Sequence, residues 1–187
     1  MVPVPERLAH GGKFELLPVY SDCIADLFEA EIESIEELVP WMHWCHPNRS
    51  ISDTTQWVES RSEAWERRKA YSFLIADRRS SQIVGTCGLD HLDEVNHFAN
   101  LGYWVRTSRT RESAATEATR LLSEFGFSAV ELVRIEIVVA VGNIASERVA
   151  VKVGALREGL LRNRLTQRGE VRDAYMFSLV PNPDKRD

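Results

Sequence analysis

The sequence predicts an α/β fold in which a mixed sheet of about seven strands carries helices on its faces. Segments with strand periodicity and segments with helical periodicity follow one another in the order β-α-α-β-β-β-α-β-α-β-β. The run LVRIEIVVAV (132–141) is apolar and β-branched, which is typical of a buried central strand. The 187 residues show no repeat and no second compositional block, so we expect one domain with an ordered core over about 14–180.

The first third of the chain is predicted to contain one strand and two helices. The strand FELLPV covers 14–19 and follows a lead-in with two prolines and two glycines. Polar residues at 21–22 and 52–53 are expected to cap the two helices. The first helix has apolar residues at helical spacing and ends near Pro40, and the second reads DTTQWVESRSEAWERR.

The rest of the chain is predicted to alternate between strands and helices. Strands at 71–77 and 82–92 form a hairpin, and a third strand covers about 97–106. A helix then covers about 113–129 and leads to the central strand. That strand turns into a helix which ends at Gly154, a residue type that commonly follows the last helical turn. A second hairpin closes the fold.

Composition argues against several classes of protein. A formal net charge of −5 argues against general nucleic-acid binding and is compatible with a cationic or amine substrate. No apolar run approaches the ~20 residues that span a membrane, and the N-terminal segment MVPVPERLAHGGK lacks the apolar core of a signal peptide. Cys23, Cys45 and Cys87 are scattered without metal-ligand spacing, so we expect free thiols in a reducing cytoplasm.

An anion site is predicted where the third strand of this series meets the next helix. Residues 96–120 read NHFANLGYWVRTSRT and then RESAATEATR, so a strand ends in a polar bend that opens into a helix. The first backbone N–H groups of a helix lack internal partners, and the helix dipole adds positive charge there. The small residues Ser113, Ala114 and Ala115 would let a phosphate approach the backbone. We therefore expect a phosphate-bearing cofactor at this turn.

Four segments carry a resemblance to a known family, in the expected order along the chain. They are LVPWMHWCHP (38–47), NLGYWVRTSRT (100–110), GNIASERVAVKVGA (142–155) and the closing hairpin (156–179). Together they resemble the GNAT superfamily of acyl-coenzyme-A-dependent N-acetyltransferases, and more closely its subgroup that acetylates the N-termini of ribosomal proteins. The resemblance covers about 14–179 and implies a mostly antiparallel sheet with helices on both faces.

The resemblance implies where acetyl-coenzyme A, the co-substrate, is bound. In such enzymes the cofactor strand and the next strand diverge, and the pantetheine arm lies between them. Backbone groups near Tyr103, Trp104 and Val105 would then pair with the arm. The pyrophosphate would lie against the following loop. Its members here are Thr110, Arg111, Glu112, Ser113, Ala114 and Ala115.

The resemblance also assigns roles to two residues after the central strand. Asn143 would hydrogen-bond the pantetheine or line the active-site channel, and from the sequence alone it is equally a helix cap. Ser146 would lie near the thioester sulfur and protonate the leaving thiolate. Ser146 otherwise reads as an ordinary small residue in the first helical turn.

The loop departs from the family pattern, which usually reads Q/R-x-x-G-x-G/A. Serine replaces the central glycine at Ser113, and close relatives often carry glycine where this chain has Arg111. A side chain would be strained wherever φ must be positive, but the first helical positions have ordinary φ and ψ, so Ser113 is expected to fit. Arg111 is available to contact a phosphate, whereas Glu112 is unfavourable there unless it turns outward. We expect cofactor binding to survive but to weaken.

The general base is left open by the sequence. Some ribosomal-protein acetyltransferases are thought to use a glutamate in the closing segment, and the matching position here is Leu165. Carboxylate or imidazole groups that remain as candidates are Asp90, His91, Asp93, Glu136 and Asp173.

The amine acceptor is expected to contact the loop within the segment 38–47. Trp41 and Trp44, with His91, are the candidates for substrate contact, although the two tryptophans also suit a junction between helices. His43 and His46 have no third ligand nearby in the sequence, so no metal site is expected.

The sequence thus predicts transfer of acetyl to a primary amine by direct attack in a ternary complex. A protein or peptide N-terminus is the first candidate acceptor and a small or amino-acid-like amine the second. The alternatives left open are a degenerate domain that binds a ligand or partner without turnover, and the use of another acyl group. The subgroup often forms dimers, but no feature here fixes a homodimer interface.

Overall fold

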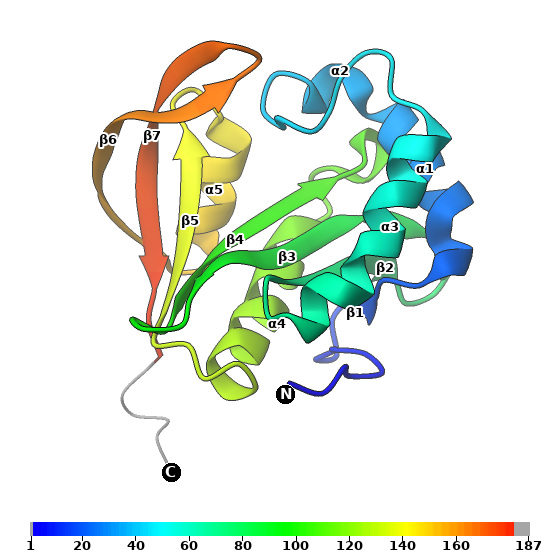
Figure 1. The fold of residues 1–187 in the computed structure, drawn as a ribbon, viewed down its shortest axis with the longest axis horizontal. Helices are drawn as coiled ribbons and strands as arrows, with labels where there is room; N and C mark the ends of the chain where they lie inside the picture. The colour runs from blue at the N-terminus through cyan, green and yellow to red at the C-terminus, as the bar shows by residue number, and fades with distance from the viewer. Residues whose placement is uncertain (1, 182–187) are drawn as a thin grey trace.

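A seven-stranded sheet in the order β1-β2-β3-β4-β5-β7-β6 organises the structure, a computed structural model that describes residues 2–181 (Figure 1). Its strands are β1 (Phe14–Pro18), β2 (Ala70–Asp77), β3 (Ile83–Asp93), β4 (Phe98–Val105), β5 (Arg134–Ala140), β6 (Leu156–Gln167) and β7 (Glu170–Leu179). Neighbouring strands are antiparallel except β4 and β5, which are parallel. The predicted mixed, mostly antiparallel sheet is confirmed.

Helices cover both faces of this sheet. They are α1 (Ile24–Glu33), α2 (Ile35–Leu38), α3 (Ile51–Glu66), α4 (Ala114–Ser128) and α5 (Ile144–Lys152), with 3₁₀ turns η1 (Ser21–Cys23) and η2 (Thr107–Arg109). In Figure 1, α1 and α3 lie on one face and α4 and α5 on the other. No helix among the described residues is both long and apolar enough to span a bilayer.

Each face of the sheet has its own apolar core. Under α4, Trp65, Tyr71, Phe73 and Phe125 are buried and pack edge-on or tilted, with ring centroids 4.9–5.8 Å apart. Under α1 and α3, a second cluster includes Trp104 of β4. Because successive side chains of a strand point to opposite faces, β4 contributes to both cores.

Two predicted helix caps are wrong. The second helix begins at Ile51 and is capped by Ser50, not by a residue at 52–53, because Asp53 completes a capping box by accepting the Ser50 N–H at 2.8 Å. The residues at 21–22 make no side-chain cap and form the 3₁₀ turn that leads into α1. The first helix is also interrupted at Ser34, whose hydroxyl donates to the Ala30 carbonyl oxygen.

The strands β4 and β5 diverge after a short paired segment. Only Phe98–Asn100 pairs with Arg134–Glu136. Beyond it, β4 stays paired with β3, and β5 stays paired with β7. Figure 1 shows the two strands separating like a fork. The backbone of β4 after Asn100 therefore has no neighbouring strand on its β5 side.

The turn that follows β4 is held on one side by α1. Arg106 is buried, and its guanidinium forms ion pairs with Glu29 (3.0 Å) and with Glu33. The hydroxyl of Ser34 accepts the Thr107 N–H at 3.0 Å. Glu33 is bound by Arg106, which holds the pKa of its carboxyl at about 2. The break between α1 and α2 thus serves as an anchor for the end of β4.

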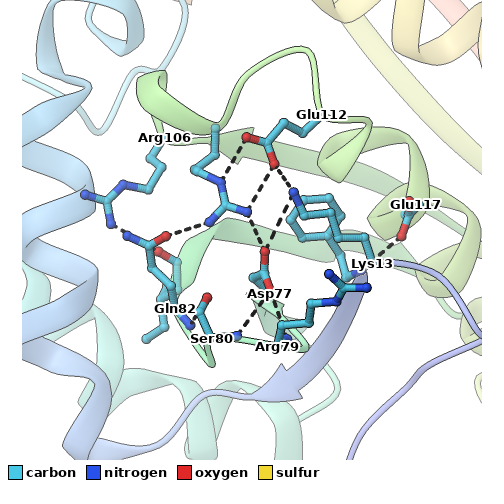
Figure 2. Close-up of polar contacts among 11 residues, drawn as sticks. Lys13, Asp77, Arg79, Ser80, Gln82, Arg106, Glu112 and Glu117 are labelled. Carbon is cyan, nitrogen blue, oxygen red and sulfur yellow. Dashed lines mark hydrogen bonds and ion pairs between the residues drawn. The ribbon is translucent and has the colours of Figure 1, made fainter.

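On its other side, the turn is held by four charges that meet near the end of β2 (Figure 2). Arg109 donates to Asp77 at 2.5 Å and to Glu112 at 3.1 Å. Lys13, just before β1, pairs with Glu112 and lies 3.8 Å from Asp77. Asp77 also accepts the Arg79 N–H at 2.9 Å. Two cations and two carboxylates therefore balance one another and fix the turn to the sheet.

We expect Asp77→Asn to destabilise the protein by about 1–3 kcal/mol near neutral pH, because Arg109 loses its buried carboxylate partner. The Arg109 hydrogen bond holds the pKa of Asp77 at about 2, below the ordinary 3.8. The stabilisation is therefore full above the unfolded-state pKa and is lost as the pH falls toward the folded-state pKa. Urea unfolding should show the largest difference from wild type at about pH 7 and a shrinking difference below about pH 4. If the free energy of unfolding differed by the same amount at all pH values, the loss could not come from the charge of Asp77 beside Arg109.

Candidate active site

A cavity of about 570 Å³ opens where β4 and β5 diverge. Its walls come from β2, β3, β4, β5, β6, α3, the start of α5 and the loop after α2. Gly88 of β3 lies directly opposite Gly102 of β4 in the sheet register, and both line the cavity. A Cβ at Gly102 would meet no atom within 4 Å. The missing side chain at Gly102 leaves open space in the middle of the sheet, whereas a Cβ at Gly88 would lie 3.2 Å from the Tyr71 carbonyl oxygen.

Asn143 and Ser146, the two candidates after the central strand, both line this cavity at the N-terminus of α5. Asn143 caps the helix by accepting the Ser146 N–H at 3.1 Å. The Ser146 hydroxyl lies 2.9 Å from the Tyr103 hydroxyl, which also lies 3.2 Å from the Ser146 carbonyl oxygen. Burial raises the pKa of Tyr103 to about 12, so its hydroxyl keeps its proton at neutral pH. The Tyr103 side chain thus connects β4 to the start of α5.

The β4 candidates divide between the two faces of the sheet. The side chain of Trp104 packs in the core under α1 and α3, and that of Val105 packs against the core under α4. Trp104 nevertheless lines the cavity, as Tyr103 does, whereas Val105 is not among its lining residues. Successive residues of a strand direct their backbone groups to opposite sides. Because the Arg106 N–H donates to the Val84 carbonyl oxygen of β3, the backbone groups of Trp104 also face β3, and those of Tyr103 and Val105 face the gap.

The loop 110–115 forms the N-terminus of α4, but its backbone differs from the expectation. Ser113 is the N-cap with φ 70° and ψ 11°, and Arg111 has φ 65°, so both lie in the left-handed region. The expectation that Ser113 has ordinary helical φ and ψ is wrong, because it precedes the helix and reverses the chain. Glycine tolerates this conformation without steric cost, which explains the glycines of the family pattern.

The backbone N–H groups at this helix N-terminus are free. Among the described residues, those from Arg111 to Thr116 have no hydrogen-bond acceptor. Thr110 is exposed, Ala114 is buried, and Ala115 is partly buried, so small residues surround the opening of the helix. Free N–H groups and the helix dipole together favour an anion here.

Glu112 does not repel an anion as strongly as the sequence suggested. Arg109 donates two hydrogen bonds to its carboxylate, both at 3.1 Å, and Lys13 pairs with it as well. These two cations hold the pKa of Glu112 below its ordinary range and compensate its charge. The carboxylate belongs to the charged cluster that anchors the turn, as Figure 2 shows.

The predicted acceptor residues do meet at the cavity. Trp41, Trp44 and His91 all line it. Trp44 also packs against Trp104, with ring centroids 6.0 Å apart, and carries the Arg49 guanidinium 4.7 Å above its ring. Trp44 therefore both packs against the core under α1 and α3 and lines the cavity.

Two of the five candidates for the general base line the cavity, and three do not. Asp90 and His91 line the cavity, where Asp90 Oδ1 lies 2.8 Å from His91 Nδ1 and accepts the Asn100 amide at 2.9 Å. The other three candidates make contacts elsewhere and do not line the cavity: Asp93 accepts backbone N–H groups of its turn, Glu136 pairs with Arg134, and Asp173 accepts the Asn163 N–H. Leu165 lines the cavity and brings no carboxylate to it.

Sequence reasoning missed several polar residues in the cavity wall, among them Gln167 and Arg61. Gln167 of β6 is buried and donates to the Trp41 carbonyl oxygen at 2.6 Å, while its Oε1 has no partner among the described residues. Arg61 of α3 lines the same cavity. Gln167 stands beside a hairpin turn, and Arg61 sits in a helix rich in charge, so neither carried a signal in one sequence.

Comparison with known proteins identifies the family to which the chain belongs. Residues 14–156 match the family described as the Acetyltransferase (GNAT) domain. The chain is 31% identical over 159 residues to YdaF of Bacillus subtilis, provisionally named a ribosomal N-acetyltransferase, covering 82% of this chain and 84% of YdaF. It is 25% identical over 170 residues to the ribosomal-protein-serine acetyltransferase of Escherichia coli, covering 91% and 92%.

A solved structure agrees with this placement. RimL, a ribosomal L7/L12 α-N-protein acetyltransferase in complex with coenzyme A, aligns with a TM-score of 0.86 at 19% identity, covering 94% of this chain and 98% of RimL. The chain belongs to the GNAT family of acetyltransferases. It is an N-acetyltransferase with acetyl-coenzyme A as co-substrate.

We expect Ser113→Gly to stabilise the protein by about 0.5–1 kcal/mol, because glycine removes the left-handed strain at this position. It should also tighten binding of acetyl-coenzyme A, since a phosphate could then approach the free N–H groups more closely. Thermal unfolding and calorimetric titration measure the two effects. Ser113→Ala keeps the strain and is the matched control. If the glycine variant were no more stable than the alanine variant, the left-handed backbone at Ser113 would not be strained.

Proposed function

We propose that this acetyltransferase modifies the N-terminal amine of a protein or peptide by direct attack on acetyl-coenzyme A. The observation that carries the proposal is a single cavity whose lining includes both strands of the β4–β5 gap and the side chains of Trp41, Trp44 and Trp57. An aromatic lining beside the gap suits the apolar and amide groups of a flexible chain end. The name of the Escherichia coli relative, a ribosomal-protein-serine acetyltransferase, supports the same class of acceptor.

In this proposal acetyl-coenzyme A takes the place of the strand that β4 lacks. The pantetheine arm pairs with backbone groups of Tyr103 and Val105, which face the gap, as an added strand pairs with a sheet edge. The pyrophosphate lies against the free N–H groups of 111–116 at the start of α4. Asn143, which lines the cavity while capping α5, borders the arm on the β5 side.

Ser146 supplies the proton for the sulfur. When the Tyr103 hydroxyl donates to Ser146 Oγ, at 2.9 Å, the serine proton is left free to point into the cavity. As the amine nitrogen bonds to the thioester carbon and the carbon–sulfur bond breaks, that proton passes to the departing thiolate. Tyr103 then restores the serine proton and is itself reprotonated from solvent.

Asp90 and His91 receive the proton that the amine must lose. Their hydrogen bond at 2.8 Å connects a carboxylate in the cavity to an exposed imidazole, so the proton has a route to water. Gln167, whose Oε1 is buried without a partner in the described structure, belongs to the same cavity wall. Burial raises the pKa of Cys87 in the cavity wall, which keeps this thiol protonated and favours direct attack over a covalent enzyme intermediate.

Mass spectrometry of a peptide panel tests the acceptor. Peptides that begin with serine or alanine should gain one acetyl group on the N-terminal amine in the presence of acetyl-coenzyme A. The same peptides with a blocked N-terminus and a free lysine serve as controls and should remain unmodified. Acetylation of lysine side chains or of small polyamines, with N-termini untouched, would overturn the proposed acceptor.

Ser146→Ala is expected to lower kcat by about 10²-fold, because it removes the proton donor to the thiolate. Binding of acetyl-coenzyme A should change little, since the Ser146 N–H that Asn143 caps remains. Tyr103→Phe, which leaves the serine in place, should cost less than Ser146→Ala. Stopped-flow assay of thiol release with a peptide acceptor gives kcat for each variant. A Ser146→Ala enzyme with wild-type kcat would exclude the assigned role.

A further inference from the structure

Arg61 is exceptional among the arginines of the described chain that are not exposed. Every other one forms an ion pair with a carboxylate, namely Arg49, Arg106, Arg109, Arg134 and Arg172. For Arg61, no carboxylate of the described residues lies within 4.0 Å. A partly buried cation without a partner is unfavourable, so an anion from outside would be stabilised beside it.

The guanidinium of Arg61 is held in place with one end free. Its Nε donates to the Trp57 carbonyl oxygen at 3.0 Å and Nη2 donates to Ser60 at 2.7 Å, while the group stacks 4.9 Å from the Trp57 ring centroid. Nη1 makes only a 3.4 Å contact with Ser72. The fixed orientation and the weakly bonded Nη1 leave N–H groups for a ligand in the cavity.

The cavity differs in charge from the rest of the chain. Its formally charged lining residues are Arg61, Arg164 and Asp90, so the lining has one more cation than anion. The whole chain has a net charge of −5. Burial lowers the pKa of Arg61, and the charge of Asp90 only partly opposes this shift, because Asp90 lies beyond ion-pair distance and is occupied by His91 and Asn100. The two arginines are therefore available to an anionic group.

We propose that the acceptor has an anionic group close to its reacting amine, and that Arg61 determines this specificity. The inference rests on the proposed function for the site of acetyl transfer. An amine that approaches Asp90 and a carboxylate that approaches Arg61 would be bound by complementary charges in one cavity. For a peptide, the acceptor is then a chain whose first residues include aspartate or glutamate.

The phosphates of the co-substrate do not fill this role. Arg61 lies on α3 and contacts Ser72 on the face of the sheet that α1 and α3 cover. The free N–H groups of 111–116 begin α4, which covers the other face. Phosphates at that helix N-terminus would leave Arg61 without a partner.

The test compares two peptides that differ only in charge, with aspartate or asparagine at the second position after an N-terminal serine. Wild-type enzyme should show about a tenfold higher kcat/KM for the aspartate peptide, the gain of one charge-assisted hydrogen bond. Arg61→Gln, which keeps an N–H donor without the charge, should bring the ratio close to one. Arg67→Gln, an exposed arginine of the same region that pairs with Glu63 outside the cavity, is the matched control and should keep the wild-type ratio.

The outcomes separate this inference from the proposed function. A wild-type enzyme that acetylates both peptides equally, or a ratio that Arg61→Gln leaves unchanged, overturns the inference while peptide acetylation stands. Free aspartate and asparagine are assayed in parallel. If they are acetylated in the predicted ratio and the peptides are not, the anionic specificity is supported and the peptide acceptor fails. Activity toward none of the four amines overturns both.

Discussion

The structure depends on the short pairing between β4 and β5. Three residues of each strand pair, and then β4 follows β3 while β5 pairs with β7 over six residues. The divergence leaves strand backbone without a neighbour inside the protein, which is costly unless water or a ligand satisfies its polar groups. The cavity, the position of Tyr103 and the start of α5 all follow from this one separation.

Charged contacts fix the end of β4 and the turn that follows it. Arg106 ties the end of β4 to α1, and Arg109 ties the following turn to Asp77 of β2. With both ends of the turn fixed, Arg111 and Ser113 keep left-handed φ values that would ordinarily favour glycine. The chain thus keeps left-handed φ values at two residues other than glycine while the turn around them is anchored at both ends.

Much of the fold could be predicted from the sequence because its signals are local. Hydrophobic periodicity located the seven strands, and the run at 132–141 contains the observed central strand β5. The cap at Ser50 and the break at Ser34 were missed, because each depends on one side-chain hydrogen bond that neighbouring serines and aspartates could equally make. Element boundaries follow such small differences in energy.

The candidate site could be predicted only where a motif marked it. Asn143, Ser146 and the two tryptophans lie in recognisable segments, and all of them line the cavity. The φ of Ser113 could not be read from residue type, because it depends on where the turn ends and the helix begins. Arg61 and Gln167 reach the cavity through tertiary packing of α3 and β6, so no spacing in the sequence connects them to the site.

Amide hydrogen exchange with and without acetyl-coenzyme A tests the central claim most directly, namely that the co-substrate fills the gap between β4 and β5. If it does, binding should protect two segments together: 101–105 of β4 and the free N–H groups of 111–116. Protection elsewhere on the surface, with these two segments unchanged in the bound state, would contradict the account.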